Sequence, residues 1–485
     1  MTLPESFTDL MASCLPAAEA DRFFASLTDG EQPVAVRLNP AKCGASGVTF
    51  AGADGRSIAT QPVPWCPEGL YLAERPAFTL DPLLHGGAYY VQDPSCQFLT
   101  HTLRSFVTGP VSALDLCAAP GGKSTAALSS LPEGSVLVCN EIDRKRAFIL
   151  AENVAKWGNP NVCVTNGAPA DFSPLHEAFD LVIADVPCSG EGMFRKDPEA
   201  VGKWSPAKVR ECAALQRRIL ADIWPCLKPG GLLVYSTCTF NVHEDEVQLE
   251  YLCSELGATL LPIPVQPAWH IHPALCGSFA PHVQAADACR FMPHFTRGEG
   301  FFIAVVRKGN GESDGDEADG RTSFRAVGKK KDKGAQRPSS RTAAPGREWL
   351  TWTDGSQPGA LLHQRADGTV LLVPEALTDL FRRLQSARVQ LLSAGVELGL
   401  LKGKDRQPAH ALALSSVLNA GAFPHADVDL DTALLYLRRE SIVLDPSVPL
   451  GYVLITYRDR PLGFVKNIGR RCNSLYPAEW RIRNL

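Results

Sequence analysis

The chain has 485 residues, of which 45% are hydrophobic, and its formal net charge is −4 at pH 7. At the usual ~100 to 200 residues per domain this length predicts more than one domain, and the apolar content can fill a substantial core. The sequence has neither a run of about 18 apolar residues nor a basic N-terminal region followed by an apolar run, so we expect a cytoplasmic protein without a membrane span.

The cysteines and histidines exclude two further classes. Fifteen cysteines are spread along the chain without a CxxC pair, and several of them fall within strand or helix patterns. This distribution favours free thiols in a reducing cytoplasm over a disulfide framework. The histidines cluster only loosely, around His270, His272 and His282, so we expect no metal site.

A small N-terminal domain is expected first in chain order. Residues 1–85 contain the helical stretch ESFTDLMASCL and an expected strand at RLNPAK. They precede the segments that we expect to form the main sheet.

The first segment with a functional pattern is SALDLCAAPGGKSTAAL, from Ser112 to Leu128. A short apolar strand breaks at Pro-Gly-Gly and resumes as a helix of small residues. Gly121 and Gly122 lack Cβ atoms, so the turn can take positive φ and let a ligand lie against main-chain amides at the helix start. The segment is neither a Walker loop nor a full G-x-G-x-x-G signature, so by itself it leaves the presence of a nucleotide-like ligand open.

The next expected strand, SVLVCNE, ends at Glu141, which lies 19 residues after Gly122. In doubly wound folds an acidic side chain about 20 residues beyond the glycine turn binds the ribose hydroxyls. Alternatively, Glu141 and Asp143 favour the positive end of the helix expected from Arg144 to Trp157. One residue can fill both roles.

Two cysteines 50 positions apart each follow a short apolar run, Cys188 in DLVIADVPCSG and Cys238 in GLLVYSTCTF. The runs at 180–185 and 231–236 are typical of parallel strands covered on both faces. Ligands bind beyond the carboxyl ends of such strands, so both thiols face one ligand if the strands are neighbours. The alternative is that both cysteines are simply small buried residues.

Helices on both faces of a doubly wound, mainly parallel sheet are the expected α/β fold. The helix at 207–224 illustrates the pattern, because its apolar residues recur at three- or four-residue steps. The residues expected to face the sheet are Val209, Cys212, Leu215, Ile219 and Ile223.

A polar segment follows the catalytic region. Residues 309–347 contain few apolar side chains and divide into an acidic and then a basic half, which predicts a disordered linker. The basic cluster at 329–333 either contacts phosphates nonspecifically or belongs to a merely solvating tether.

The last part of the chain is apolar-patterned again, with strands expected at TVLLV from Thr369 and on both sides of a charged turn at 458–460. Its basic and aromatic tail could bind RNA through phosphate contacts and base stacking. Alternatively, the aromatic residues belong to a small β-barrel core. The tail residues concerned are Lys466, Arg470, Arg471, Tyr476, Trp480, Arg481 and Arg483.

The motifs CAAPGGK, NEIDRKR, DVPCSGEG, LKPGG and YSTCT, in this order, resemble those of RNA cytosine-5 methyltransferases of the RsmB/RsmF/NSUN type. The resemblance covers residues 37–307 and includes RLNPAK, YVQDPSCQ and RFMPHFTRGEGFF. It implies a class I S-adenosylmethionine-dependent methyltransferase. The C-terminal half resembles, more loosely, the extension of bacterial RsmF-like 16S rRNA methyltransferases, which ends in a PUA-like β-barrel.

The resemblance also implies roles for four side chains. Cys238, in the TC context, would attack carbon 6 of cytosine, and Cys188, in the PC context, would assist breakdown of the covalent adduct. Asp185 would stabilise the charge that develops on the base, and Lys123 would face the same site. Without the resemblance, Asp185 is a helix-cap acid and Lys123 a solvated helix lysine.

S-adenosylmethionine is the implied methyl donor. The stretch TNGAPADF departs from many relatives, which carry an acidic residue for the adenine after the third strand, so that contact stays open. The residues expected to hold the donor are Cys117, Ala118, Ala119, Pro120, Gly121, Gly122, Lys123, Glu141 and Asp185.

The expected function is methylation of carbon 5 of a cytidine in 16S rRNA or the small ribosomal subunit, by a monomer. Methylation of tRNA and a noncatalytic role in ribosome assembly are the alternatives. The expected domains are 1–85 (N-terminal, auxiliary and RNA-binding), 86–308 (catalytic), 309–347 (linker), 348–400 (auxiliary) and 401–485 (PUA-like, RNA-binding).

Overall fold

The computed structural model describes residues 2–43, 47–52, 54–310, 345–403 and 405–483. The predicted linker lies outside the described residues for most of its length, so the prediction of disorder stays untested. Within the described ranges, no helix is both long and apolar enough to cross a membrane.

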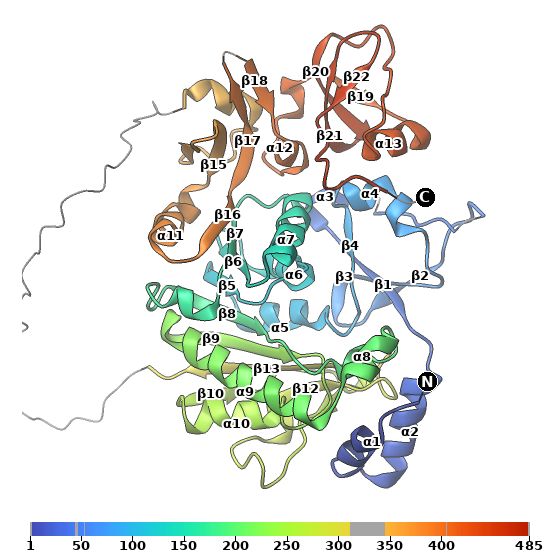
Figure 1. The fold of residues 1–485 in the computed structure, drawn as a ribbon, viewed down its shortest axis with the longest axis vertical. Helices are drawn as coiled ribbons and strands as arrows, with labels where there is room; N and C mark the ends of the chain where they lie inside the picture. The colour runs from blue at the N-terminus through green and yellow to red at the C-terminus, as the bar shows by residue number, and fades with distance from the viewer. Residues whose placement is uncertain (1, 44–46, 53, 311–344, 404, 484–485) are drawn as a thin grey trace, which may run out of the picture.

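A ten-stranded sheet lies at the centre of the molecule (Figure 1). Its strands are β5 (Ser112–Asp115), β6 (Val136–Glu141), β7 (Val162–Asn166), β8 (Phe179–Asp185), β9 (Leu227–Thr237), β10 (Ala258–Leu261), β11 (His272–Pro273), β12 (Ala288–Phe291), β13 (Phe301–Lys308) and β16 (Gln390–Ala394). The order is β11-β12-β13-β9-β8-β5-β6-β7-β16, with β10 paired to β13. Strands β5 to β9 are parallel, and the winding direction reverses between β5 and β8.

Helices cover both faces of this sheet. One apolar cluster joins the sheet to α9 (Pro206–Ile223), α10 (Glu246–Ser254) and α11 (Glu375–Ser386). A second joins it to α5 (Phe98–Phe106), α6 (Gly122–Ser130) and α7 (Arg144–Trp157). Successive residues of β5, Ala113 and Leu114, belong to different clusters, as strand alternation requires. The predicted doubly wound α/β fold is confirmed.

The N-terminal region forms its own small sheet, in the order β2-β3-β1-β4. Helices α1 and α2 of this region pack against the segment around α8 (Pro198–Lys203) through aromatic contacts, such as Phe7 with Phe194 at 5.1 Å before α8 and with Trp204 at 5.4 Å at its end. The elements are α1 (Glu5–Ala12), α2 (Ala17–Thr28), β1 (Val34–Leu38), α3 (Pro40–Cys43), β2 (Thr60–Val63), β3 (Cys66–Leu72), α4 (Pro82–His85) and β4 (Tyr89–Val91).

Two further four-stranded sheets form the C-terminal region, in the orders β14-β15-β17-β18 and β19-β20-β21-β22. A shared apolar cluster that includes Trp349, Trp352 and Phe464 joins them. The elements are β14 (Leu361–Gln364), β15 (Thr369–Val373), β17 (Val396–Lys402), β18 (Asp405–Pro408), α12 (His410–Leu414), β19 (His425–Asp427), α13 (Leu430–Leu437), β20 (Gly451–Tyr457), β21 (Arg460–Asn467) and β22 (Cys472–Ser474).

Strand β16 was not anticipated as part of the catalytic sheet. It pairs antiparallel with β7, with Gln390 opposite Asn166 and Ala394 opposite Cys163. The pairing covers an edge that would otherwise present unpaired backbone groups. One strand of the predicted auxiliary module 348–400 thus belongs to the sheet, while the domain boundaries themselves stay a prediction.

Arg460, where the turn from β20 enters β21, attaches the C-terminal region to the N-terminal region at α3. The guanidinium of Arg460 donates to the carbonyl oxygens of Lys42 at 3.1 Å, Cys43 at 3.3 Å and Gly47 at 3.1 Å. These carbonyls come from a segment more than 400 residues earlier in the chain. One side chain therefore connects the two ends of the protein.

Arg460→Ala should lower the stability of the whole protein, because three part-buried carbonyls lose their donor. We expect a loss of about 1–3 kcal/mol in the free energy of unfolding, measured by thermal or urea denaturation. Arg458→Ala, an exposed arginine of the same turn, is the control and should change stability by less than about 0.5 kcal/mol. Equal effects of the two changes would contradict the assignment.

Candidate active site

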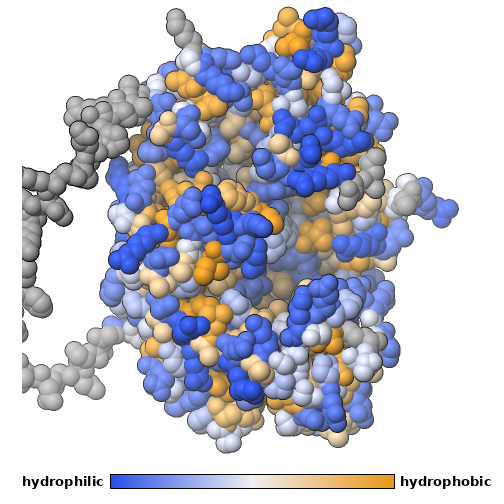
Figure 2. Space-filling view, viewed as in Figure 1, coloured by the Kyte–Doolittle hydropathy of each residue, from blue (hydrophilic) through white to orange (hydrophobic). Residues whose placement is uncertain are grey.

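The carboxyl ends of four parallel strands carry the predicted site residues. In the pairing of β8 with β9, Asp185 lies opposite Ser236, so Cys188 and Cys238 follow adjacent strand ends. Their Sγ atoms are 3.1 Å apart, and both side chains are partly exposed. The surface in Figure 2 is hollowed between the segments of α7 and α8. The prediction that both thiols lie in one place is confirmed.

The pKa of Cys188 is held well above its ordinary value, because its thiol shares a hydrogen bond with Cys238 and is largely shielded from water. A thiol with a raised pKa stays protonated and is a proton donor rather than a nucleophile.

Lys123 and Asp185 form an ion pair beside the thiols. Lys123 Nζ lies 2.8 Å from Asp185 Oδ2, and Ser236 Oγ donates to Asp185 Oδ1 at 2.9 Å. Burial acts to lower the pKa of Lys123, but the neighbouring Asp185 carboxylate outweighs it and the pKa is raised. Lys123 therefore stays charged. Its ammonium lies 5.0 Å above the Phe301 ring, and Cys96 Sγ lies 4.0 Å from Nζ.

The turn between β5 and α6 has the shape that the glycine pattern predicts. Gly121 takes φ 116°, a left-handed conformation that a side chain would disfavour. Arg146 donates to the carbonyl of Ala119 and Asn153 donates to that of Pro120, both at 2.8 Å. Of the predicted donor-binding set, Ala118, Ala119, Gly121 and Glu141 are buried, Pro120 is exposed and the others are partly exposed. The turn is thus fixed from α7.

The neighbouring strands β5 and β6 each end in a carboxylate, Asp115 and Glu141. Asp115 is fully buried, and its Oδ1 has no hydrogen-bond partner among the described residues, while Oδ2 accepts from Ser124 Oγ at 2.6 Å. Glu141 is buried at the end of β6, on the far side of β5 from the thiols. Its Oε1 accepts from the amide of Asp143 at 2.9 Å, and Arg146 lies 3.5 Å from Oε2. Asp115 Oδ1 and the Glu141 carboxylate can both accept hydrogen bonds, so this edge of the sheet fits a ligand with hydroxyl and amino groups.

An apolar side chain that the sequence analysis missed completes this part of the site. Ile142, directly after Glu141, is 63% exposed. The Asn166 amide donates to the carbonyls of Glu141 at 2.7 Å and Ile142 at 3.0 Å, which fixes the backbone beneath it. Asp171 instead accepts from the Ala168 amide. An exposed apolar side chain beside a buried acid can cover the flat face of an aromatic ring.

The N-terminal region reaches this turn through Arg37. Its guanidinium donates to the Thr125 hydroxyl at 2.6 Å and to the Gly122 carbonyl at 3.2 Å, and it lies 4.6 Å above the Trp157 ring. The RLNPAK motif contains Arg37, but no sequence pattern indicates that its side chain crosses to α6.

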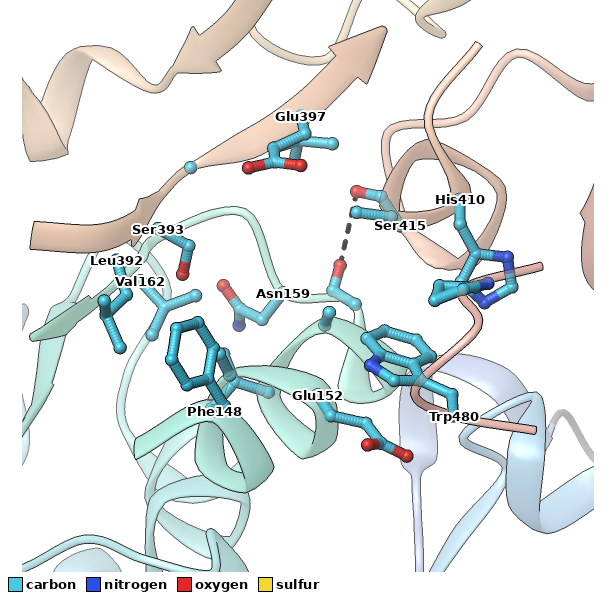
Figure 3. A pocket seen from close by; sticks show the side chains of 18 of the residues that line it. Phe148, Glu152, Asn159, Val162, Leu392, Ser393, Glu397, His410, Ser415 and Trp480 are labelled. Carbon is cyan, nitrogen blue, oxygen red and sulfur yellow. Dashed lines mark hydrogen bonds between the residues drawn. The ribbon is translucent and has the colours of Figure 1, made fainter. Parts of the chain in front are cut away.

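A second cavity, of about 780 Å³, lies between α7 and the C-terminal region (Figure 3). Phe148, Asn159 and Trp480 line it, and none of the predicted site residues does. Trp480 packs on His410 at 5.1 Å, and Tyr476 is only 1% exposed. The alternative of core packing therefore holds for Tyr476, which cannot stack on a base, whereas Arg470, Arg471, Arg481 and Arg483 are exposed.

The described residues contain no group of side chains suited to a metal ion.

Three family models match the chain. Residues 110–307 match 16S rRNA methyltransferase RsmB/F, residues 3–94 the N-terminal domain of 16S rRNA methyltransferase RsmF, and residues 423–482 the methyltransferase RsmF PUA domain. In its N-terminal, catalytic and C-terminal parts, the chain is thus similar to RsmB/F and RsmF methyltransferases. It is an RNA methyltransferase that uses S-adenosylmethionine.

Relatives in this family are similar along nearly the whole chain. Ribosomal RNA small subunit methyltransferase F of Erwinia tasmaniensis is 28% identical over 487 residues, which cover 98% of this chain and 96% of the relative. The protein of the same name from Klebsiella pneumoniae is 29% identical over 492 residues, with the same coverage.

Solved structures share the catalytic fold. A methyltransferase homolog from Pyrococcus horikoshii is 26% identical, with a TM-score of 0.50, and the match covers 63% of this chain and all of that one. NSun6 from Pyrococcus horikoshii, solved with SFG, is 18% identical with a TM-score of 0.51 over 63% of this chain and 98% of that one. The predicted methyltransferase fold with N-terminal and PUA regions is confirmed.

Asp115→Asn should change how stability depends on pH. Burial raises the pKa of Asp115 to about 7, so the folded protein favours the neutral acid. The wild type therefore loses stability as pH rises from the unfolded pKa of about 4 through about 7. The asparagine keeps the acceptor for Ser124 and does not titrate. We expect the Tm of the variant, relative to wild type, to increase by several degrees between pH 5 and pH 8.

Asp180→Asn is the control for this series, because Asp180 lies at the opposite end of the neighbouring strand and pairs with Lys228 at 2.7 Å. It should show no such increase. A difference in Tm for Asp115→Asn that stays the same at both pH values would contradict the prediction.

Proposed function

We propose that this enzyme methylates carbon 5 of a cytidine in 16S rRNA through a covalent adduct between Cys238 and carbon 6. The distance of 3.1 Å between the two Sγ atoms, beside the Lys123–Asp185 ion pair, carries the proposal. An enzyme that needs one thiol for attack and another for release requires both at one base.

Carbon 5 of cytosine is a poor nucleophile, which explains the need for a thiol. Addition of Cys238 Sγ to carbon 6 forms the C–S bond and makes carbon 5 electron-rich. S-adenosylmethionine supplies an electrophilic methyl group when it is bound. A base must then take the proton from carbon 5, and the C–S bond breaks with its electron pair returning to Cys238 as a thiolate, which leaves the methylated base.

Asp185 and Lys123 act on the base during attack. Asp185 is held by Lys123 and Ser236, so its carboxylate has a fixed position at the end of β8. A carboxylate there accepts a hydrogen bond from the exocyclic amine or from a protonated ring nitrogen, and it stabilises positive charge on the ring. The charged Lys123 balances the charge of this carboxylate and holds it in place.

Cys188 acts during release. Its raised pKa keeps the thiol protonated, and a protonated thiol within reach of Cys238 can assist breakdown of the adduct. The nucleophile must first lose its own proton, which makes the reaction sensitive to the ionisation of the pair.

The methyl donor would lie along the edge formed by the turn after β5 and the end of β6. Glu141 would bind the ribose hydroxyls, Asp115 offers a free acceptor, and Ile142 would cover the adenine. The base must leave its stack to reach the thiols, since carbon 6 is not accessible inside a helix. We further propose that the protein acts in the cytoplasm as a monomer, where ribosomal RNA is its partner.

Cys238→Ala and Cys188→Ala separate the two thiol roles. With labelled methyl donor, we expect the wild type to form 5-methylcytidine in naked 16S RNA or in 30S subunits. Cys238→Ala should lower the rate by at least about a thousandfold, whereas Cys188→Ala should accumulate a covalent RNA adduct. Nucleoside mass spectrometry and denaturing gels measure the two outcomes.

Cys276→Ala, which changes an exposed cysteine, is the control and should keep full activity. Labelling of tRNA alone would overturn the choice of substrate. Donor binding without labelling of any RNA would favour a noncatalytic role in ribosome assembly.

Glu141→Gln should weaken donor binding, because a carboxylate that accepts from two hydroxyls becomes an amide. We expect the Kd for S-adenosylmethionine, measured by calorimetry, to rise roughly tenfold to a hundredfold. Asp143→Asn is the matched control, since that carboxylate caps α7 by accepting from the Arg146 amide at 2.8 Å. If both variants weaken binding equally, the role of Glu141 is that of a structural acid only.

A further inference from the structure

Two fully buried glutamates lie behind the thiols, and the mechanism above does not use them. Glu191 follows Cys188 by three positions and Glu244 follows Cys238 by six. Both are 0% exposed. Their carboxylates make contacts that cross from one cysteine loop to the other.

Glu191 holds the loop of Cys238. Its Oε2 accepts from the backbone amides of Phe240 at 2.7 Å and Asn241 at 3.1 Å, two and three positions after that cysteine. A backbone hydrogen bond joins the same two loops, because the amide of Gly192 donates to the carbonyl of Cys238 at 2.8 Å. A side chain from the first loop thus fixes the path of the second.

Glu244 holds the loop of Cys188 in the same way. Its Oε2 accepts from the backbone amide of Ser189 at 2.9 Å, directly after that cysteine. Gln216 on α9 donates to the same oxygen at 2.9 Å and to the carbonyl of Pro187 at 3.0 Å. The residues on both sides of Cys188 are therefore fixed through one carboxylate and one amide.

One amide joins the two carboxylates. Asn241 Nδ2 donates to Glu191 Oε1 at 2.8 Å and to Glu244 Oε1 at 2.9 Å. Trp204 Nε1 adds a further donor to Glu191 at 2.9 Å. We call Glu191, Glu244 and Asn241 the cross-brace.

The cross-brace lacks a counter-charge. Two residues of the adjoining segment, Asp245 and Glu246, pair with the buried guanidinium of Arg290. For Glu191 and Glu244, the described residues offer no such cation and only neutral donors. Burial of two carboxylates without a cation is costly. Burial raises the pKa of Glu191 to about 7 and also raises that of Glu244.

We propose that Glu191 and Glu244 are positioning residues that keep the thiols of Cys188 and Cys238 within reach of one base. Each is carried on the loop of one thiol and fixes the backbone of the other loop. The inference rests on the proposed two-thiol function, but it concerns a distance that can be measured without RNA. Loosening the cross-brace separates the thiols and leaves the binding of donor and RNA intact.

The test uses full-length Glu191→Gln and Glu244→Gln. Glutamine has the same shape, but its NH₂ group replaces an acceptor and meets an N–H donor. We expect kcat to fall roughly tenfold to a hundredfold, with the KM for RNA and the Kd for the methyl donor within about twofold of wild type. A general loss of folding would change all three and would lower the Tm in parallel.

Phenylarsine oxide tests directly whether the two thiols lie close together. Its arsenic forms one bond to each of two neighbouring sulfur atoms and releases water, and peptide mass spectrometry identifies the bridged pair. Bridging of Cys188 to Cys238 should be rapid in the wild type and about tenfold slower in both glutamine variants, as one lost buried hydrogen bond implies. Bridging at the wild-type rate with unchanged kcat would overturn the proposal.

Glu250→Gln is the matched control. This glutamate lies on α10 and fixes a different loop by accepting from the amide of His282 at 2.9 Å. It should bridge and methylate as the wild type does. Absence of 5-methylcytidine in the wild type would refute the proposed function, whereas slowed bridging in the variants would still uphold the cross-brace.

If the glutamine variants do not fold, Trp204→Phe tests the proposal instead. It withdraws a single donor from Glu191 and keeps an aromatic ring in the contact with Phe7 at 5.4 Å. We expect bridging and kcat to fall about threefold, in keeping with a weak single hydrogen bond. Unchanged bridging and unchanged kcat would overturn the proposal.

Discussion

The backbone pairing of β8 with β9 determines where chemistry can occur in this protein. The two strands are parallel neighbours, so their carboxyl ends lie side by side at the edge where ligands bind in such sheets. Asp185 and Cys188 leave one strand end and Cys238 leaves the other. No single loop could bring these groups together, because 50 residues separate the cysteines. The pairing of the two strands, and not closeness in sequence, therefore brings these groups together.

Supporting contacts come from every direction around that edge. Lys123 arrives from the helix after β5, Arg37 reaches the same helix from the N-terminal region, and the cross-brace closes the side facing α9. Charge within the site is arranged unevenly. Lys123 and Asp185 balance each other's charge. In contrast, Asp115 Oδ1 has no hydrogen-bond partner among the described residues, and the cross-brace accepts hydrogen bonds only from neutral donors. The ionisable groups around the site therefore differ in how they respond to pH.

Local patterns in the sequence were sufficient for the elements that carry the site. The apolar runs before Cys188 and Cys238 predicted strands, and the helix at 144–157 has the predicted bounds. The Pro-Gly-Gly turn predicted a backbone able to take positive φ, and Gly121 does so. The contacts that position these elements could not be predicted in this way. Glu191 stood within a quoted motif, yet its partners follow Cys238 in a different loop. Contacts of this kind depend on the folded path of the chain, and no periodicity indicates them.

The same limit applies to the C-terminal region. Tyr476 and Trp480 stand in a basic tail that suggested base stacking, but Tyr476 packs against buried Tyr436 and His410. Composition alone cannot distinguish an exposed ring from a core ring, because both occur beside arginines. Ile142 is the opposite case, since an apolar residue after a buried strand would ordinarily be expected inside, yet it is exposed beside Glu141.

Strand β16 has a consequence for how the protein is made. Its partner β7 ends at Asn166, and β16 itself ends at Ala394, so the two strands leave the ribosome far apart in time. When the catalytic motifs have all been synthesised, at residue 308, the sheet still lacks its last strand and the backbone groups of β7 remain open to other chains. The nascent enzyme therefore passes through a stage in which its catalytic half is complete in sequence but incomplete in structure. A fragment that ends there retains this unpaired edge permanently.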